Sequence, residues 1–367
     1  MKKIKLLHIT PWYPSDDNPL EAIWIKRHIE SLGDAAENDI LHLQLKDGAW
    51  SYSHTVQNEL RRVILHTPIK SWFVKEIIAS IILLLILLVH YTGKRYALWN
   101  FHIAYPNLVY LSHLKSLFRV PFLITEHWSY YHFHFYSNKK LKRVKSIFSR
   151  GIPLITVSKA LQDAITKFCG FEVNSEIIPN VIDDSFHFRK EIEKSEHFLM
   201  VAFWKDPKQP LKIIEAIAEL KKKGHNLKLK IGGYGPLLDS VQQKVNELRM
   251  EGNIELIGRL DAEDLAIEMN RCKAFIIPTK YETFSVICAE ALCCGTVVLA
   301  DSVGALTELI QDGDGVLVKD DKWEEALTGD FNGDHPAISN NACKRFSREV
   351  VASKYLDCIN QIIHKTP

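Results

Sequence analysis

The densest group of chemically useful residues lies in 278–295, where a short apolar stretch leads into a polar loop and then a helical pattern. The N-terminus of a helix presents unpaired N–H groups and the positive end of the helix dipole, and both attract anions. The backbone N–H groups of Thr283, Phe284, Ser285 and Val286 are therefore candidates to hold a diphosphate.

Two carboxylates belong to the same segment. Glu282 stands at the mouth of the loop, and Glu290 follows eight residues later. If the helix begins near residue 284, we expect both on one helix face. Carboxylates accept hydrogen bonds from hydroxyl groups, so the pair suits the sugar and the ribose of a sugar nucleotide. The alternative is a solvated helix face with an acidic first turn.

The second half of the chain supplies a regular scaffold for these groups. Short apolar runs alternate there with amphipathic helical segments, which predicts right-handed β-α-β crossovers and a parallel sheet. The expected strands are 198–202, 227–231, 254–257, 274–277, 296–299 and 315–318, and the expected helices are 211–223, 237–250, 263–269, 284–293 and 305–310.

The first half shows the same alternation with longer insertions. Its expected strands are 4–9, 62–66, 97–102, 120–125 and 153–157, and its expected helices are 23–32, 77–89, 107–117 and 159–168. Residues 183–196 hold eight charged residues in fourteen, a composition typical of an exposed linker. We therefore predict an α/β protein with Rossmann-like domains at 1–185 and 186–345, followed by a final helix in 346–367.

Several motifs then point to one enzyme family. In chain order they are Pro11-Trp12-Tyr13-Pro14, Thr125-Glu126-His127-Trp128, Ile178-Pro179-Asn180-Val181, Lys208, Gly233-Tyr234-Gly235-Pro236, Gly258, Glu282 with Glu290, Gly295 and Gly304-Ala305. Together they resemble the retaining family-4 glycosyltransferases (glycosyl transferases group 1) of the GT-B fold, over nearly the whole chain. The resemblance implies two Rossmann-like domains facing across a cleft, with the C-terminal helix crossing back to the N-terminal domain.

The resemblance also assigns donor-side roles. Lys208 matches the basic residue that contacts the donor diphosphate, Glu282 the residue near the hydroxyls of the donor sugar, and Glu290 the residue that holds the ribose. Phe203 stands where the family usually has an arginine, and nearby Lys205 is a candidate to replace it, although a lysine cannot reproduce the two-pronged contact of arginine.

Three further donor-side residues follow strand ends. Gly233 and Gly235 match a tight turn beside the donor, because the third glycine of a dinucleotide fingerprint is missing at 238. Arg259 follows Gly258, where the family often contacts the nucleotide base; the alternative is an ordinary surface arginine.

In the first half, the resemblance places His127 beside the transferred sugar, as a catalytic-site contact together with Lys208 and Glu282. His132 and His134 are rival candidates. Glu126 and Trp128 are expected to line the acceptor pocket.

The first loop departs from the family. Relatives commonly carry glycine near positions 21–22, so that backbone amides approach the donor phosphate, whereas this chain has Glu21-Ala22. The sequence therefore argues against amide contact with phosphate at this loop, and Asn18 is carried over as an acceptor-binding residue.

Charge and hydropathy raise the question of a membrane. Residues 1–190 hold 24 Lys and Arg against 16 Asp and Glu, a net of +8, whereas the rest of the chain nets −6. The apolar run 77–89 is shorter than the ~20 residues of a bilayer span, so we expect a core or surface-embedded helix rather than a crossing. Residues 139–150 fit a basic amphipathic helix on anionic lipid, or a helix packed on its own domain.

The predicted function is that of a retaining glycosyltransferase of cell-surface polysaccharide synthesis, which moves a sugar from a nucleotide-sugar donor to a glycan or lipid-linked acceptor. We expect no cofactor and no metal, and no nucleic-acid partner. Seven cysteines without a disulfide framework fit the cytoplasm, with peripheral membrane contact through 77–89 and 139–150. The alternatives are a sugar-nucleotide epimerase or hydrolase, and a non-catalytic membrane-peripheral scaffold that binds sugar nucleotides.

Overall fold

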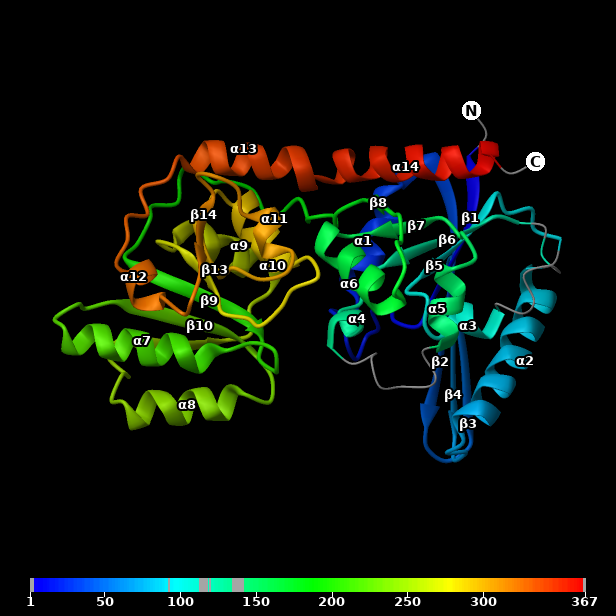
Figure 1. Ribbon diagram of the computed structural model, residues 1–367, viewed down its shortest axis with the longest axis horizontal. Coiled ribbons are helices and arrows are strands. Elements are labelled where there is room, and N and C mark those ends of the chain that lie inside the picture. The colour runs from blue at the N-terminus through cyan, green and yellow to red at the C-terminus, as the bar shows by residue number, and fades with distance from the viewer. Residues whose placement is uncertain (1–2, 92, 112–117, 119, 134–141, 366–367) are drawn as a thin grey trace. The chain divides into compact units, whose positions relative to one another are not determined.

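The computed structural model describes residues 3–91, 93–111, 118, 120–133 and 142–365. The chain forms two compact units, which we call unit 1 (residues 1–180 and 351–367) and unit 2 (residues 181–350). Each unit is built on its own sheet with helices packed against it (Figure 1). The predicted α/β class with two Rossmann-like sheets is confirmed.

Unit 1 contains a sheet in the order β3-β4-β2-β1-β5-β6-β7-β8. Its strands are β1 (Ile4–Thr10), β2 (Ala36–Asp47), β3 (Ser51–Gln57), β4 (Leu60–Thr67), β5 (Leu98–His102), β6 (Phe122–Glu126), β7 (Leu154–Thr156) and β8 (Glu176–Ile177). Neighbours pair in parallel, except that β3 and β4 form an antiparallel hairpin at the edge. The carboxyl ends of β1, β5 and β6 therefore lie side by side along one edge of the sheet.

The helices of unit 1 are α1 (Ile23–Ser31), the 3-10 helix η1 (Gly33–Ala35), α2 (Trp72–Tyr91), α3 (Asn107–Leu111), α4 (Tyr130–Phe133), α5 (Lys142–Phe148) and α6 (Lys159–Cys169). The predicted helix 107–117 begins as expected, and its residues 112–117 lie outside the described residues. The last helix, α14 (Arg348–Lys365), belongs to unit 1 from Val351 onward. The buried Tyr355 hydroxyl anchors it there by contacting Asn100 and Thr125.

Helix α2 has one buried and one exposed apolar face. Leu83, Ile86 and Leu87 are buried in unit 1, whereas the opposite side exposes seven large apolar side chains: Phe73, Val74, Ile77, Ile81, Leu85, Leu88 and Val89. In the described part of the chain, Phe73–Tyr91 is the one helix long and apolar enough to cross a membrane. One face of α2 therefore packs on its own unit, and the opposite face is left exposed.

The basic segment 139–150 is described from residue 142 onward. Val144, Ile147 and Phe148 of α5 are buried, so its apolar face packs on unit 1 and does not face outward. Arg143 forms an ion pair with Glu76 of α2. Of the two predicted alternatives, a helix on anionic lipid and a helix packed on its own domain, helix 142–148 is therefore the one packed on its own domain. Its apolar side chains are not available to a bilayer.

Unit 2 contains a wholly parallel sheet in the order β11-β10-β9-β12-β13-β14. The strands are β9 (His197–Phe203), β10 (Lys228–Tyr234), β11 (Ile254–Gly258), β12 (Phe275–Ile277), β13 (Val298–Asp301) and β14 (Gly315–Val318). The helices are α7 (Pro210–Lys222), α8 (Leu238–Glu247), α9 (Ala262–Arg271), α10 (Val286–Cys293), α11 (Leu306–Leu309), α12 (Trp323–Leu327) and α13 (His335–Phe346). Helix α7 packs with α8 and α12, and α10 packs with α9, α11 and α13.

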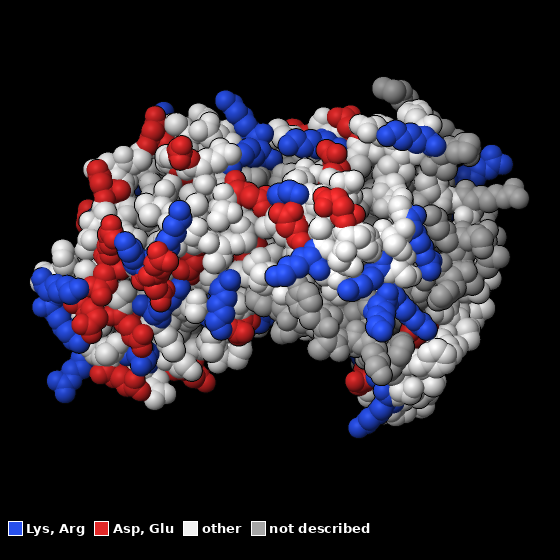
Figure 2. All heavy atoms as spheres, viewed as in Figure 1, with Lys and Arg blue, Asp and Glu red and all other residues white. Residues whose placement is uncertain are grey.

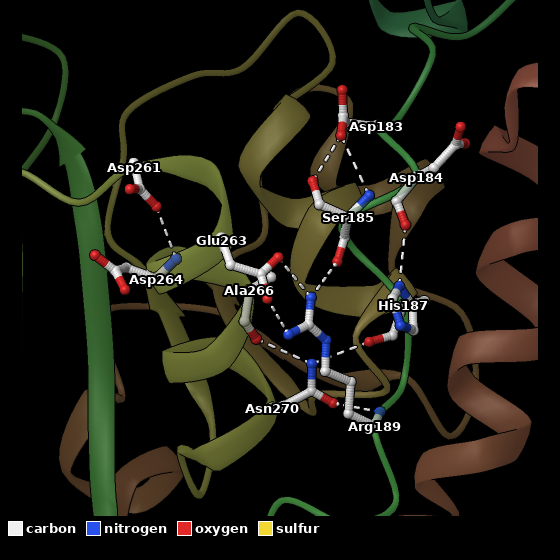
Figure 3. Close-up of polar contacts among 10 residues, drawn as sticks. All are labelled: Asp183, Asp184, Ser185, His187, Arg189, Asp261, Glu263, Asp264, Ala266 and Asn270. Atoms are coloured by element: carbon white, nitrogen blue, oxygen red, sulfur yellow. Dashed lines mark hydrogen bonds and ion pairs between the residues drawn. The ribbon is translucent and has the colours of Figure 1, made fainter.

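Residues 183–189, part of the segment predicted as an exposed linker, are bound to α9 by an ion pair and hydrogen bonds (Figure 3). Arg189 forms a two-pronged ion pair with Glu263, and one of its arms also donates to the carbonyl of Ser185 at 3.1 Å. The buried Asn270 accepts from the Arg189 backbone N–H at 2.8 Å and donates to the His187 carbonyl at 3.0 Å. Residues 183–189 therefore belong to the folded part of unit 2, which corrects the expectation of an exposed linker there.

The charge asymmetry of the sequence is visible on the molecular surface. On the face in Figure 2, red and blue side chains are interspersed over unit 2. On the same face of unit 1, the charged side chains that are coloured are scattered and mainly basic. Opposite charges that alternate on unit 2 favour local ion pairs.

Candidate active site

Lys208 and Glu282 form an ion pair near the carboxyl end of the unit 2 sheet. Two loops bring them together: Gln209 N–H donates to the Pro278 carbonyl at 2.9 Å, and Lys280 N–H donates to the Pro207 carbonyl at 3.1 Å. Both side chains are largely withdrawn from solvent, with 19% of the lysine and 14% of the glutamate exposed. The predicted diphosphate contact and the predicted sugar contact are thus direct neighbours.

Asp301, a residue that the sequence reasoning missed, holds this loop in place. It ends β13 and is buried. One carboxylate oxygen accepts the Thr279 N–H at 2.7 Å, and the other accepts Lys212 Nζ at 2.8 Å and Trp323 Nε1 at 3.1 Å. The only sequence signal is its place at the end of a predicted strand.

The backbone of Glu282 is fixed by the glycine motif at residue 304. Gly304 has φ +50°, and a Cβ atom there would lie 2.3 Å from the Glu282 carbonyl oxygen. The next residue, Ala305, donates its N–H to that carbonyl at 3.0 Å. Only glycine permits this approach, which gives the Gly304-Ala305 motif a structural reason.

Helix α10, whose N-terminus is the predicted anion site, begins two residues later than expected. Ser285 has φ +66° and stands before the first helical residue, Val286. Glu282 is therefore in the loop and not on the helix, which corrects the prediction that it shares a helix face with Glu290. Glu290 is buried on α10, and Phe284 is buried with its ring edge-on to Phe346. Thr283, a further predicted donor, is half-buried in the loop.

The hydroxyl of Ser285 is a buried polar group just before α10. Ser285 is 6% exposed, and its Oγ has no hydrogen-bond partner among the described residues. Leaving a buried hydroxyl unsatisfied costs about 1–3 kcal/mol, so such a group in a native structure calls for an explanation. At a helix N-terminus, an anionic ligand supplies one.

Gly233 and Gly235 bring β10 and its following loop against the end of β9. A Cβ atom would lie 2.0 Å from the Ala202 carbonyl oxygen at Gly233 and 2.5 Å from the Trp204 carbonyl oxygen at Gly235. Both glycines have positive φ values, as the predicted tight turn requires.

An exposed row of aromatic and basic side chains lies at the ends of β9, β10 and β11. The rings of Phe203 and Tyr234 are 5.0 Å apart, Lys205 lies 5.3 Å from the Phe203 ring, and Arg259 lies 5.1 Å from the Tyr234 ring. In this structure Lys205 and Arg259 therefore contact rings of their own unit.

In unit 1, His127 follows β6 but is buried within a histidine cluster. Its ring lies 5.3 Å from that of His28 and 5.9 Å from that of His102, and His102 Nε2 is 3.1 Å from His8 Nδ1. Burial, with a smaller contribution from His28, lowers the pKa of His127 well below its usual range. A neutral imidazole positions groups by hydrogen bonds and does not act as a fixed cation. Its rival His132 is exposed on α4, and His134 lies outside the described residues.

Glu126 does not line a pocket, because it is fully buried. Its Oε1 accepts the Ala104 N–H at 2.7 Å and the Tyr131 hydroxyl at 2.6 Å, and the N–H groups of Trp128 and His127 also donate to this carboxylate. Burial raises its pKa to about 7 against these hydrogen bonds. Its predicted acceptor contact is corrected: Glu126 fixes the loops that follow β5 and β6.

The other unit 1 candidates lie in loops. Asn18 is exposed in a tight turn in which its N–H donates to the Ser15 carbonyl at 3.1 Å, and Trp128 is half-buried. Ala22 has φ +51°, the left-handed conformation that glycine adopts most easily. The loop therefore keeps a glycine-like backbone at one position where the family has glycine. Among the described residues, no three His, Cys, Asp or Glu side chains gather as metal ligands.

The comparisons with known proteins agree with this geometry. Residues 182–329 match the family model "Glycosyl transferases group 1", which confirms the predicted resemblance to the group 1 glycosyltransferases. An uncharacterized glycosyltransferase of Methanocaldococcus jannaschii is 26% identical over 221 residues, 58% of each chain. A Campylobacter jejuni N-acetylgalactosaminyltransferase, named for a diphospho-undecaprenol acceptor, is 30% identical over 46% of this chain and 47% of its own. The chain thus spans about half the length of these relatives.

A solved structure extends the likeness to the whole chain. HepE of Anabaena, in complex with UDP, matches with a TM-score of 0.73 at 15% identity, over 98% of this chain and all of HepE. At this identity the likeness shows the fold, and that fold is GT-B.

Proposed function

We propose that the protein, whose residues 182–329 match the glycosyl transferases group 1 model, is a retaining glycosyltransferase that uses a nucleotide-sugar donor. The observation that carries this proposal is the Lys208–Glu282 pair, next to the buried hydroxyl of Ser285 at the start of α10, which has no hydrogen-bond partner among the described residues. The pair supplies a phosphate-binding cation and a sugar-binding carboxylate, and Ser285 supplies a hydrogen-bond donor for an anion.

In this proposal, protein groups alone hold the diphosphate. Lys208, the N-terminal N–H groups of α10 and the Ser285 hydroxyl stabilise the negative charge that develops on the leaving nucleoside diphosphate. Lys205 contributes after leaving its contact with Phe203. Binding the diphosphate draws Lys208 away from Glu282, whose carboxylate then accepts hydrogen bonds from the donor sugar. Glu290 holds the ribose and Arg259 the base, as the family resemblance implies.

Retention of the anomeric configuration follows when the acceptor hydroxyl attacks from the face that the phosphate leaves. The departing phosphate then takes the proton of that hydroxyl, so no separate base is needed. A neutral His127 fits this chemistry because it is restricted to hydrogen bonding.

We propose a glycan or lipid-linked acceptor in cell-surface polysaccharide synthesis, and a cytoplasmic protein that binds the membrane peripherally. The exposed face of α2 supports the membrane contact: Ile81 and Leu85 at its centre are both more than half exposed. Lys70 precedes this helix and Lys94 and Arg95 follow it, where basic side chains favour anionic lipid headgroups. Because one apolar face of α2 is packed on unit 1, its opposite apolar face is left for the membrane interface.

A screen of sugar nucleotides tests the proposal. UDP-glucose, UDP-galactose, UDP-N-acetylglucosamine, GDP-mannose and ADP-glucose are compared for thermal stabilisation of the full chain, since a ligand at 100 times its Kd stabilises by about 2.7 kcal/mol. The best donor is then incubated with lipid-linked and oligosaccharide acceptors. Transfer that depends on an acceptor supports the proposal. Conversion of the nucleotide without an acceptor indicates an epimerase or hydrolase, and binding without any turnover indicates a scaffold.

A further inference from the structure

Four aromatic side chains gather at the carboxyl edge of the unit 1 sheet. Trp12 follows β1, Tyr105 follows β5, and Trp128 and Tyr130 follow β6. These three strands are adjacent in the sheet, in the order β1-β5-β6. In open parallel sheets, ligands bind outside the carboxyl ends of the strands, so this group, which we call the aromatic wall, stands at the edge where a ligand is expected.

The rings of the aromatic wall are in contact and mostly parallel. Trp128 lies 4.2 Å from Tyr130 at an interplanar angle of 23°, and 6.0 Å from Tyr105 at 12°. Trp12 meets Trp128 edge-on, with centroids 5.3 Å apart and an angle of 80°. Parallel and edge-on contacts at these distances are the favoured geometries of aromatic pairs, so the wall is a defined surface.

Buried groups hold the wall in position from behind. Trp12 and Trp128 pack against a core cluster that includes Tyr13, Ile25 and Ile103. The Thr10 hydroxyl donates a hydrogen bond to the carbonyl of Trp12 at 2.8 Å.

The buried carboxylate of Glu126 connects the other three members of the wall. It accepts hydrogen bonds from the N–H of Ala104, next to Tyr105, from the N–H of Trp128, and from the hydroxyl of Tyr131, next to Tyr130. One fully buried side chain thus fixes both loops, which is the kind of support that a pre-organised binding surface needs.

The wall is nevertheless open to solvent. Tyr130 is 42% exposed, and Trp12, Tyr105 and Trp128 are each half-buried. Tryptophan and tyrosine combine a large apolar face with a polar tip, and a pyranose ring is amphipathic in the matching way. Its axial C–H bonds form an apolar face with partial positive charge that suits the negative face of a π-system, while its hydroxyls point outward to water. The exposed face of α2, in contrast, is almost wholly aliphatic and suits lipid chains.

We propose that the aromatic wall binds a pyranose ring of the acceptor glycan, with Tyr130 and Trp128 as its main contacts and Glu126 as a positioning residue. This inference rests on the proposed function, because it assigns the acceptor side of that reaction to unit 1. It adds Trp12, Tyr105 and Tyr130 to the acceptor site, and it predicts that the acceptor group next to the reacting hydroxyl is a sugar and not a bare lipid phosphate.

The first test measures sugar binding without turnover. Saturation-transfer NMR on the full chain uses methyl glycosides of glucose, galactose, mannose and N-acetylglucosamine as probes. We expect saturation of the C–H groups on one ring face, and about tenfold weaker binding in Tyr130→Ala, as for the loss of one stacking contact. Tyr130→Phe keeps the ring and should bind within twofold of wild type. Phe171→Ala removes an exposed aromatic ring elsewhere in unit 1 and should change nothing.

The second test uses turnover. With the best donor, Tyr130→Ala and Trp128→Ala should raise the acceptor KM about tenfold and leave the donor KM unchanged; thermal unfolding of each variant confirms that it folds. An unchanged acceptor KM in Tyr130→Ala overturns the inference, as does undecaprenyl phosphate that displaces the methyl glycosides in the NMR experiment. If no sugar nucleotide binds, the proposed function fails, but the NMR result still decides whether the wall binds sugar.

Discussion

The contact between Lys208 and Glu282 leads to an unusual prediction, because the carboxylate that serves the sugar also neutralises the cation that serves the phosphate. Glu282→Gln removes that charge and leaves Lys208 free for an anion. Two unit charges ~4 Å apart attract by about 4 kcal/mol at an effective dielectric constant of 20. Both side chains are partly solvated, which weakens this attraction. We therefore expect the free energy of diphosphate binding to change by about 1–1.5 kcal/mol, or about tenfold in affinity.

Glu282→Gln should therefore bind the free nucleoside diphosphate about tenfold more tightly than wild type, while transfer from the sugar nucleotide falls by about 100-fold. The second effect follows from the loss of a charged hydrogen-bond acceptor for the sugar hydroxyls. Isothermal titration with UDP, GDP and ADP measures the first effect, and initial rates measure the second. Lys208→Gln, in contrast, should weaken diphosphate binding at least tenfold.

The matched control is Lys222→Gln, on the exposed end of α7, which should leave both quantities unchanged. The reasoning is refuted if Glu282→Gln weakens nucleoside diphosphate binding, because the carboxylate would then help to build the phosphate site and would not compete for its cation.

Three further predictions concern other parts of the molecule. Ser285→Ala should weaken nucleoside diphosphate binding about fivefold in titration calorimetry without lowering the midpoint of thermal unfolding, since the hydroxyl has no partner among the described residues; a large loss of stability would contradict this. Ile81→Gln with Leu85→Gln should reduce co-sedimentation with phosphatidylglycerol vesicles at least tenfold and leave the unfolding midpoint nearly unchanged, with Phe171→Gln as the control; equal vesicle binding by both would show that α2 does not dock. Burial lowers the pKa of His28 from its usual 6.5 to about 4. As the pH falls, His28 is therefore protonated in the unfolded chain before it is protonated in the folded one. This group alone should lower the free energy of unfolding by about 3 kcal/mol as the pH falls from 6.5 to 4. Urea titration across that range measures the slope, which His28→Gln should reduce by about one proton, and an unchanged slope in the variant would refute the assignment.

The elements with regular apolar patterns could be predicted from sequence, and the edge of unit 1 could not. The strands of unit 2 and the helix at 159–168 show clear periodicity and match the structure to within a few residues. Strand β3 has no buried residue, so no alternation marks it. Strand β2 places Asp39 and Gln44 among its apolar residues, and its pattern was therefore missed.

The candidate site could be predicted where a motif fixes the backbone, and less well where side chains compete. Gly304 and Gly235 serve the close approaches that their motifs imply. The pairing of Lys208 with Glu282 is set by two loops 74 residues apart in the chain, and nothing local in the sequence shows it. The motif that contains His127 predicts Glu126 in the acceptor pocket, but hydrogen bonds from the neighbouring loops draw its carboxylate inward.

The most direct test of the account measures transfer by wild type, Lys208→Gln and Lys222→Gln, from the sugar nucleotide that stabilises the protein best to a sugar-containing acceptor, with the anomeric configuration of the product read by NMR. We predict a product with the donor's configuration from wild type and Lys222→Gln, and at least a 100-fold lower rate from Lys208→Gln. An inverted product, or equal rates from all three proteins, would contradict the proposed donor site and mechanism.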